Sequence, residues 1–421
     1  MDRIVVTGGK RLQGTVCISG AKNAVLPIMA STLLADGIYK IENVPVLRDV
    51  KTMANLLISI GSNVRSDNHT IKIKTESSHN FEAPYDLVKT MRASIYVLGP
   101  LVSRFGYGKV SLPGGCAWGP RPVNLHIEGL KKLGAKVEIQ NGYIVAKAKR
   151  LKGAKITLDI PSVGATGNIL MASVLAKGTT LIENAAKEPE ITSLELFLQK
   201  MGAKINGIGK EHLEIEGVET LNAVDESIIP DRIESGTFLI AGHITGGDIR
   251  LEKTQPFFLD SIINKLRDTG AQIEEGTDWI HIKSNERIRP IDVTTAVYPG
   301  FPTDMQAQWM VLMSIANGSS IITDNIFEDR FTHVAELRRL GADITLDHNV
   351  AVVKGVQHLS GAPVMSTDLR ASASLILAGL IAKGKTYISR IYHIDRGYER
   401  IEEKLKLLGA EIYRDQEQLV V

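Results

Sequence analysis

The stretch Leu130-Lys131-Lys132-Leu133-Gly134-Ala135-Lys136-Val137-Glu138-Ile139-Gln140-Asn141-Gly142-Tyr143-Ile144-Val145 decides the fold of this chain. It has the pattern of an amphipathic helix that ends at a glycine, followed by two strands joined by an Asn-Gly turn. The same helix end occurs six times in the 421 residues, at intervals of 68 to 73 residues. The six glycines are Gly61, Gly134, Gly202, Gly270, Gly341 and Gly409. A period of this length predicts a repeat protein.

A second glycine stands about 24 residues before the first in most copies and is expected to end another helix. These glycines are Gly37, Gly178, Gly247, Gly318 and Gly384. Each unit of about 70 residues therefore reads strand, helix, strand, helix, strand, strand. Six such units contain too many strands for one sheet, so two groups of three units are predicted.

The two helices of a unit differ in composition. The first helices, such as 165–177 and 371–383, have almost no charge in their interior, whereas the second helices, such as 125–133 and 400–408, are amphipathic. A helix that is apolar on every side is buried. We therefore expect an α/β fold in which each domain has helices at its centre and sheets around them.

Charge and cysteine content argue against several classes of function. The 49 basic and 47 acidic residues nearly balance, which is unlike a nucleic-acid-binding surface. The two cysteines, Cys17 and Cys116, cannot build a disulfide framework or a zinc site, and the histidines lack metal-ligand spacing. Neither a signal peptide nor a membrane span is expected. The composition predicts a soluble cytoplasmic protein without a metal. The alternating pattern Gly14-Thr15-Val16-Cys17-Ile18-Ser19 predicts a strand in which Cys17 is buried and inert.

One loop combines chain breakers with a thiol: Pro113-Gly114-Gly115-Cys116-Ala117-Trp118-Gly119-Pro120-Arg121-Pro122. Gly and Pro at this density specify a loop. A neighbouring cation such as Arg121 favours a thiolate, or orders an anion beside the thiol. The residues alone leave two interpretations open, a reactive cysteine and an incidental cysteine in a surface loop.

Cations recur where helices are expected to begin. They are Lys22, Arg92, Arg121, Arg232, Arg330, Arg370 and Arg396. Helix amino termini attract anions, and a positive side chain there is unfavourable for the helix dipole. Several such residues, in a chain of formal net charge +2, predict a substrate with more than one anionic group, because Arg can contact phosphate and carboxylate in a bidentate manner. An ordinary surface salt bridge is the alternative for any single Arg.

Asp304 lies in Gly300-Phe301-Pro302-Thr303-Asp304-Met305-Gln306, at another expected helix start. Its carboxylate could cap the helix, or it could act as a general base that takes a proton from a hydroxyl. Asp49, Asp231 and Asp368 have similar settings, so the residue types alone do not choose among the four carboxylates.

Several blocks along the chain resemble the enolpyruvyl transferase family, in its UDP-N-acetylglucosamine 1-carboxyvinyltransferase branch. The blocks are 18–23, 89–94, 112–116, 301–306, 367–374 and 392–400. The resemblance implies two inside-out α/β barrel domains, each of three repeated units with central helices surrounded by sheets. It also implies that residues 22–229 form the domain with the Cys116 loop, and that residues 1–21 and 230–421 form the domain with Asp304, Arg370 and Arg396. The active site is expected in the cleft between them.

The same resemblance implies a reaction. An enolpyruvyl group would pass from phosphoenolpyruvate to the 3′-hydroxyl of UDP-N-acetylglucosamine, by addition and elimination with release of phosphate, as the first committed step of peptidoglycan synthesis. Cys116 would be the general acid and the site of a covalent adduct and of fosfomycin alkylation, Asp304 would take the hydroxyl proton, and Lys22 would be a catalytic cation. No cofactor and no obligate protein partner are implied.

The residues implied for each substrate overlap. Those for phosphoenolpyruvate are Lys22, Asn23, Arg92, Arg121, Arg330, Arg370 and Arg396. Those for the nucleotide sugar are Asn23, Arg92, Arg121, Pro122, Val123, Asn124, Leu125, Ser162, Val163, Gly164, Asp304 and Ile326.

Two positions depart from the family pattern. Asn124 replaces the Asp that often follows Arg-Pro-Val, and it keeps an acceptor for uracil while adding a donor. Ile160 and Pro161 stand where many members have a Lys before Ser-Val-Gly, so a cation near the diphosphate is expected to be missing. The alternatives to this function are the enolpyruvyl transferase of the shikimate pathway and a catalytically silent protein that binds an anionic metabolite.

Overall fold

The computed structural model describes residues 2–76, 80–112, 123–284, 287–327 and 329–416. The chain forms two compact units. Residues 20–229 form one, here called the Lys22 unit, and residues 1–19 together with 230–421 form the other, the Asp304 unit. The chain therefore leaves the Asp304 unit after Ser19 and returns to it at Pro230.

The repeated motif is simplest between residues 155 and 216. It consists of β10 (Lys155–Thr157), α6 (Val163–Ser173), β11 (Thr179–Glu183), α7 (Pro189–Lys200), β12 (Lys204–Asn206) and β13 (His212–Glu216). Strands β10 and β11 are parallel, and β13 lies antiparallel between β11 and β12. The order strand, helix, strand, helix, strand, strand is the one that the sequence predicts. Six four-stranded sheets of this kind are formed by the described residues.

The other two repeats of the Lys22 unit have the same plan. The first contains α1 (Lys22–Ser31), η1 (Thr32–Leu34), β3 (Gly37–Glu42), α2 (Arg48–Ile60), β4 (Asn63–Asp67) and β5 (Thr70–Thr75), and β14 (Glu226–Ser227) completes its sheet. The second contains β6 (Glu82–Ala83), α3 (Tyr85–Val88), η2 (Arg92–Val97), α4 (Leu98–Phe105), β7 (Tyr107–Ser111), α5 (Asn124–Lys132), β8 (Lys136–Gln140) and β9 (Tyr143–Lys147).

In the Asp304 unit the two strands at the amino end of the chain complete two sheets. β2 (Gln13–Cys17) is parallel to β15 (Asp248–Glu252) in the repeat with α8 (Arg232–Ile244), η3 (Pro256–Phe258), α9 (Asp260–Asp268), β16 (Gln272–Glu275) and β17 (Trp279–Lys283). β1 (Asp2–Thr7) lies between β23 (Lys385–Ser389) and β24 (Glu411–Gln416) in the repeat with β22 (Pro363–Met365), α12 (Leu369–Ile381), η5 (Ile391–Arg396) and α13 (Ile401–Leu407).

The middle repeat of this unit carries Asp304 and Arg330. It contains β18 (Val293–Thr294), η4 (Thr303–Met305), α10 (Gln306–Met313), β19 (Ser319–Thr323), α11 (Val334–Arg339), β20 (Asp343–Asp347) and β21 (Val350–Lys354). Its four strands have the order β18-β19-β21-β20.

The glycines that end the helices behave as the pattern predicts, with one exception. All six glycines of the first set have a positive φ, between 89° and 119°. In the second set Gly246 takes this role with a φ of 63°, in place of the predicted Gly247. Asn141 and Gly142 both have positive φ and join β8 to β9 in register, with Gln140 opposite Tyr143. This is the predicted hairpin turn.

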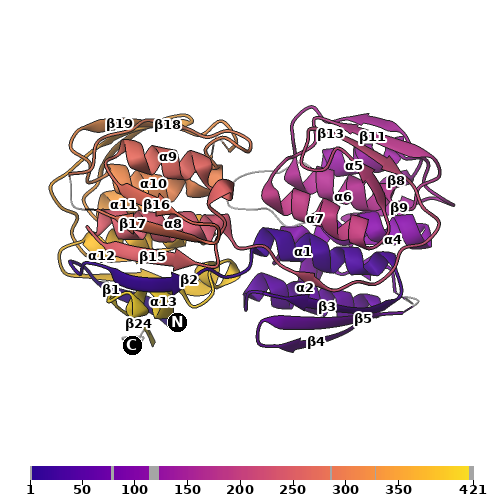
Figure 1. Ribbon diagram of the computed structural model, residues 1–421, viewed down its shortest axis with the longest axis horizontal. Helices are drawn as coiled ribbons and strands as arrows, with labels where there is room; N and C mark the ends of the chain where they lie inside the picture. Colours follow the sequence, from indigo (N-terminus) through magenta and orange to yellow (C-terminus); the bar gives the residue numbers. More distant parts are fainter. Residues whose placement is uncertain (1, 77–79, 113–122, 285–286, 328, 417–421) are drawn as a thin grey trace. The chain divides into compact units, whose positions relative to one another are not determined.

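The apolar helices lie at the centre of each unit, which confirms the predicted arrangement. Helices α8, α10 and α12 contact one another, and nearly every residue in them is buried. In the Lys22 unit, helices α1 and α2 lie over strands β3, β4 and β5 (Figure 1). Among the described residues the strands form six separate sheets, and these sheets do not join into a closed barrel.

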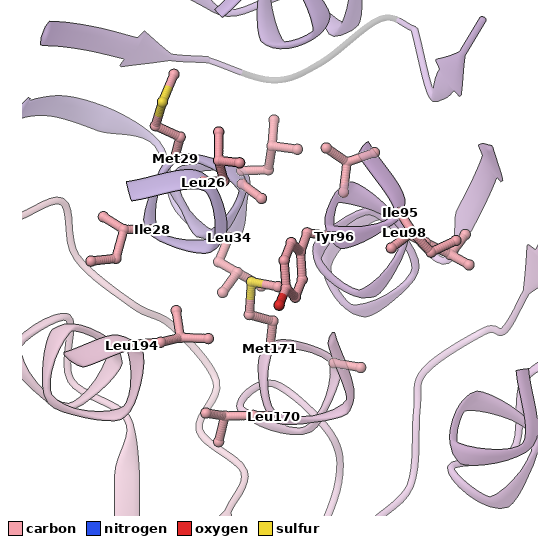
Figure 2. Close-up of a cluster of buried hydrophobic side chains, with 14 of the residues drawn as sticks. Leu26, Ile28, Met29, Leu34, Ile95, Tyr96, Leu98, Leu170, Met171 and Leu194 are labelled. Carbon is pink, nitrogen blue, oxygen red and sulfur yellow. The ribbon is translucent and has the colours of Figure 1, made fainter. Parts of the chain in front are cut away.

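The core of the Lys22 unit comes from the same central helices. Figure 2 shows Tyr96 and Met171 directed toward one another between η2 and α6, with Leu26 of α1 and Leu194 of α7 nearby. All four side chains are buried. A separate hydrophobic cluster fills the Asp304 unit. Each unit therefore has its own core, which holds the helix starts at fixed positions.

The prediction that Cys17 is buried is wrong. The strand was predicted correctly, but Val16 and Ile18 face the core, so the alternation of a strand places Cys17 on the exposed side of edge strand β2. Within the described part of the chain, we find no helix with both the length and the apolar character that a membrane crossing requires.

Candidate active site

The carboxylate of Asp304 is held by two arginines of its own unit. Arg330 Nη2 is 2.6 Å from Oδ1, and Arg370 Nη2 is 2.6 Å from Oδ2. The two guanidinium groups are nearly buried, with side-chain exposures of 7% and 6%, whereas that of Asp304 is 26%. Each carboxylate oxygen thus has its own charged donor, and one edge of the cluster reaches the surface.

The charge on Asp304 follows from this geometry. Burial alone would raise the pKa of the carboxyl group, but Arg370 and Arg330 outweigh it and hold the pKa well below its usual range. Asp304 is therefore ionised, and it is a weak base for as long as both guanidinium groups remain on it.

Arg370 is oriented by a hydroxyl group from the opposite side. Its Nη1 lies 3.3 Å from the Tyr398 hydroxyl oxygen, and that hydroxyl lies 2.8 Å from Thr237 Oγ1. Because Thr237 can donate its own proton to the Ile233 carbonyl at 2.8 Å, the Tyr398 proton goes to Thr237. The Tyr398 oxygen is then left to accept from Arg370, and Gln308 Nε2 reaches it at 3.3 Å.

The four candidate carboxylates have different partners. Asp231 and Asp368 cap α8 and α12, since the Oδ1 atom of each accepts from two backbone N–H groups of the first turn. Asp49 forms an ion pair with Lys22 Nζ at 3.6 Å. Asp304 binds the guanidinium groups of Arg330 and Arg370 and makes no side-chain cap, so the helix-cap interpretation fails for it.

Predicted cations of the Lys22 unit lie at helix starts. Lys22 is the first residue of α1, its side chain is mostly buried, and the exposed Asn23 follows it. Arg92 is the first residue of η2 and is half-buried. In the Asp304 unit, Arg396 ends η5, two residues before Tyr398.

His126 joins three of the segments that the sequence singles out. Its Nδ1 lies 3.0 Å from Asn168 Nδ2, which can donate to it, so the proton of the neutral ring is on Nε2. Burial, together with the charge of Arg92, lowers the pKa of His126 to about 4. A Cβ atom on Gly164 would lie 3.2 Å from His126 Nε2, so this glycine packs against the ring. The starts of η2, α5 and α6 thus meet around one uncharged imidazole.

Other predicted residues of the Lys22 unit lie at the same helix starts. Ser162 caps α6, with its Oγ accepting from the Ala165 N–H at 3.3 Å, and Val163 is the first residue of that helix. Val123 precedes α5, which begins with Asn124 and the buried Leu125. Cys116, Arg121 and Pro122 fall outside the described residues.

Sequence reasoning missed the residues that support the charged ones. Tyr398 and Asn168 were not singled out, although Tyr398 lies inside a block that carries the family resemblance. Asn168 offered a signal, because it is an amide within the apolar helix α6. It receives the Gly99 N–H at 2.7 Å and donates to the Ile95 carbonyl at 3.1 Å, so it links η2, α4 and α5 to α6. No group of three or more potential metal ligands is found in the described ranges.

Comparison with known proteins gives full-length matches. The profile of the EPSP synthase (3-phosphoshikimate 1-carboxyvinyltransferase) family matches residues 6–405. The UDP-N-acetylglucosamine 1-carboxyvinyltransferase of Thermodesulfovibrio yellowstonii is 57% identical over 415 residues, covering 98% of this chain and 100% of its own. That of Geobacter metallireducens is 54% identical over 417 residues, covering 99% and 100%.

Solved structures give the same result for the fold. The enolpyruvyl transferase NikO from Streptomyces tendae is 27% identical, with a TM-score of 0.90 over 98% of both chains. EPSP synthase from Acinetobacter baumannii is 18% identical, with a TM-score of 0.77 over 99% of this chain and 100% of its own, which supports the fold alone. The family profile and the relatives that are more than 50% identical along the whole length lead to one conclusion: the chain belongs to the enolpyruvyl transferase family, in its UDP-N-acetylglucosamine 1-carboxyvinyltransferase branch.

Proposed function

We propose that the protein transfers the enolpyruvyl group of phosphoenolpyruvate to the 3′-hydroxyl of UDP-N-acetylglucosamine and releases phosphate. The observation that carries the proposal is the Asp304 carboxylate held by Arg330 and Arg370, in a chain whose full-length relatives have this activity in their names. Both substrates are small anions, which suits a site rich in arginine.

The arginines divide between the two charged groups of phosphoenolpyruvate. Arg330 and Arg370 bind its carboxylate, because they already hold a carboxylate of the same size and charge. Lys22, Arg92, Arg121 and Arg396 bind its phosphate. Asn23 contacts both substrates. A carboxylate substrate therefore competes with Asp304 for the same two guanidinium groups.

This competition turns Asp304 into a base. When the substrate carboxylate draws the guanidinium groups away, the force that lowers the Asp304 pKa weakens, and the pKa rises. A carboxylate with a higher pKa accepts a proton from a sugar hydroxyl more readily. Asp304 then takes the proton of the 3′-hydroxyl as its oxygen attacks.

The reaction is an addition followed by an elimination. The 3′-oxygen forms a bond to C2 of phosphoenolpyruvate while Cys116 delivers a proton to C3, which gives a tetrahedral intermediate. Loss of a proton from C3 and of phosphate from C2 then restores the double bond. The positive charges of Lys22 and Arg396 stabilise the departing phosphate. No redox step occurs, so the chemistry balances without a cofactor.

The nucleotide sugar is bound by helix starts. Val123 to Leu125 and Ser162 to Gly164 provide backbone N–H groups at the beginnings of α5 and α6, which suit a diphosphate. Ile326 adds an apolar contact. His126 lies at the same helix starts and is uncharged, so it adds no positive charge to this region. Arg92 is the positively charged residue there that we assign to the substrates.

The product of this reaction is a precursor of peptidoglycan, so the protein acts in cell-wall synthesis and hence in cell division and shape. Its substrates are made inside the cell, and the protein works in the cytoplasm without nucleic acid or membrane.

The decisive test is phosphate release from phosphoenolpyruvate. We expect release only when UDP-N-acetylglucosamine is present. Release with shikimate 3-phosphate in its place would favour the shikimate-pathway enzyme. Binding of both substrates without release would favour the silent binding protein.

A second test concerns the thiol. Cys116→Ser is expected to slow turnover at neutral pH and to abolish covalent modification by fosfomycin, an epoxide that a thiolate opens by attack on carbon. Mass spectrometry of the intact protein measures the adduct. Equal modification of the variant and the parent protein would remove Cys116 from the mechanism, while Cys17, exposed on β2, would be the next thiol to replace.

A further inference from the structure

A second carboxylate, Asp324, lies behind the Asp304 cluster and has no role in the reaction described above. It is completely buried. Its Oδ1 accepts from the Thr295 hydroxyl at 2.8 Å and from the Ile326 and Phe327 N–H groups at 3.0 and 2.9 Å. Its Oδ2 accepts from the Thr303 hydroxyl at 2.7 Å. Four donors thus surround one carboxylate.

The bond to Thr303 continues toward the active site. A hydroxyl has one proton, and Thr303 donates it to Asp324, so the lone pairs of its oxygen are directed elsewhere. Arg330 Nη1 donates to this oxygen at 2.9 Å, and Arg330 Nη2 donates to Asp304 Oδ1 at 2.6 Å. The chain of contacts therefore runs from Asp324 through Thr303 and Arg330 to Asp304.

The same carboxylate also fixes the segment that follows β19. The N–H groups of Ile326 and Phe327 both bind Asp324 Oδ1, and Asn349 Nδ2 donates to the Asp324 carbonyl at 3.2 Å. Ile326 is one of the proposed contacts of the nucleotide sugar. Asp324 thus forms a hydrogen bond to Ile326, which is proposed for the nucleotide sugar. Through the Thr303 hydroxyl it is also linked to Arg330, which is proposed for phosphoenolpyruvate.

From this geometry we infer that Asp324 is a positioning residue of the reaction. Through the Thr303 hydroxyl it holds Arg330 in the orientation that binds the carboxylate of phosphoenolpyruvate, and it fixes the backbone beneath Ile326. This inference rests on the proposed function, since it assumes that Arg330 meets phosphoenolpyruvate. A buried acceptor of charge −1 makes the Thr303 oxygen a better acceptor for a guanidinium N–H than a neutral partner would.

The test compares two threonines that donate to the same carboxylate. Thr303→Val removes the hydroxyl that links Asp324 to Arg330. Thr295→Val removes the hydroxyl that donates to the other oxygen of Asp324. Both changes keep the size of the side chain and remove one hydrogen bond from Asp324. Each also removes the acceptor of one further donor, which is Arg330 Nη1 for Thr303→Val and the Asn325 N–H for Thr295→Val.

We expect Thr303→Val to raise the KM for phosphoenolpyruvate about tenfold, because it removes one hydrogen bond that orients a charged group. Thr303→Ser, which keeps the hydroxyl, restores the KM. Thr295→Val lowers the thermal midpoint by a similar amount and leaves the KM unchanged. An equal rise in KM in both valine variants would overturn the inference, because the role of Asp324 would then be structural. A KM unchanged in Thr303→Val would overturn it as well.

A second measurement separates this inference from the proposed function. If the parent protein releases no phosphate, the proposed function fails, and the titration of the Asp304 carboxyl still tests the positioning role. We expect carbon-13 NMR to show a higher Asp304 pKa in Thr303→Val than in Thr295→Val, because a loosely held Arg330 stabilises the carboxylate less. Equal Asp304 pKa values in the two variants would contradict the role of Thr303 and Asp324 irrespective of activity.

Discussion

In both the Asp304 cluster (Asp304, Arg330 and Arg370) and the His126 cluster (His126, Arg92, Asn168 and Gly164), an arginine lowers a pKa, but the charge that results differs. In each, an arginine lies beside a buried ionisable group, and the positive charge lowers the pKa of that group. For the carboxyl of Asp304, whose side chain is partly buried, the lower pKa preserves the negative charge that burial opposes. For the imidazole of His126, burial and Arg92 both act against protonation and leave the ring neutral. Arg330 and Arg370 therefore have an internal counter-ion, whereas the ring beside Arg92 carries no charge.

The charged Asp304 and the neutral His126 have different consequences for the binding of an anionic substrate by the neighbouring arginines. In the proposed reaction, Arg330 and Arg370 bind the substrate carboxylate by releasing Asp304, so binding and activation of the base are linked. The ring beside Arg92 is uncharged, so His126 does not compete with an anion for this guanidinium group. We expect the two clusters to respond differently when their ionisable groups are replaced.

The largest effect is expected for Asp304→Asn. The amide cannot take a proton, so kcat should fall by about 10³-fold, which is within the range for loss of a general base. The KM for phosphoenolpyruvate should stay the same or fall, because the two guanidinium groups no longer have a competing internal carboxylate. Steady-state phosphate release measures both constants. A near-normal kcat would remove Asp304 as the base, and a raised KM would contradict the competition.

The contacts around Asp304 could not be predicted from the sequence pattern. The glycine period was sufficient for the repeats and for the order of strands and helices, and the lack of charge in the first helices was sufficient for their central position. It could not predict which carboxylate the arginines hold, because Arg330 and Arg370 reach Asp304 from 26 and 66 residues away through tertiary packing. The hydroxyl groups that orient them left no periodic signal.

Local errors have equally local causes. Gly247 was predicted to end a helix, but in a Gly-Gly pair either residue can adopt the positive φ, and Gly246 does so. Cys17 was predicted to be buried because free cysteine usually is, yet its position in the alternation of β2 places it on the exposed face. Composition cannot decide such cases, whereas the direction of a side chain on a strand can.

The second largest effect is expected for Arg370→Gln. Loss of one guanidinium group should lower kcat/KM for phosphoenolpyruvate by roughly 100-fold, since hydrogen bonds to charged groups are among the strongest. Because Arg370 is the stronger of the two influences that lower the Asp304 pKa, its removal should also raise that pKa. The acidic limb of the kcat/KM profile should then move to higher pH. A limb that stays in place would show that it reports another group.

A smaller effect is expected in the pH dependence of stability. The pKa of His126 is about 4 in the folded protein and about 6.5 in an unfolded chain, so the unfolded state takes up a proton first as the pH falls. The free energy of unfolding should therefore decrease by roughly 1.5 kcal/mol between pH 6.5 and pH 5 on account of this group. His126→Gln should remove that part of the slope, which urea denaturation at the two pH values measures.

His243 provides a matched control for this prediction. Burial lowers its pKa to about 4 as well, and its ring nitrogens lie 2.8 Å from Ser284 Oγ and Thr269 Oγ1. His243→Gln should flatten the pH dependence by a similar amount. His126→Gln alone should change the KM values, because His126 lies beside Arg92 and Gly164. Equal KM changes in both variants would show that the loss of either buried histidine perturbs the structure generally, and that His126 has no specific effect on substrate binding.

The smallest effect is expected for Gly164→Ala. The added methyl group would lie 3.2 Å from His126 Nε2 and 3.3 Å from Cε1, a tight contact with a ring that Asn168 holds in place. We expect a loss of about 1 kcal/mol in stability and a few-fold higher KM for the nucleotide sugar, with the KM for phosphoenolpyruvate unchanged. A double-mutant cycle with His126→Ala tests the cause, because a smaller side chain leaves room for the methyl group. If the cost of Gly164→Ala is the same in both backgrounds, the contact with His126 is not its origin, and the neutral ring does not shape this part of the site.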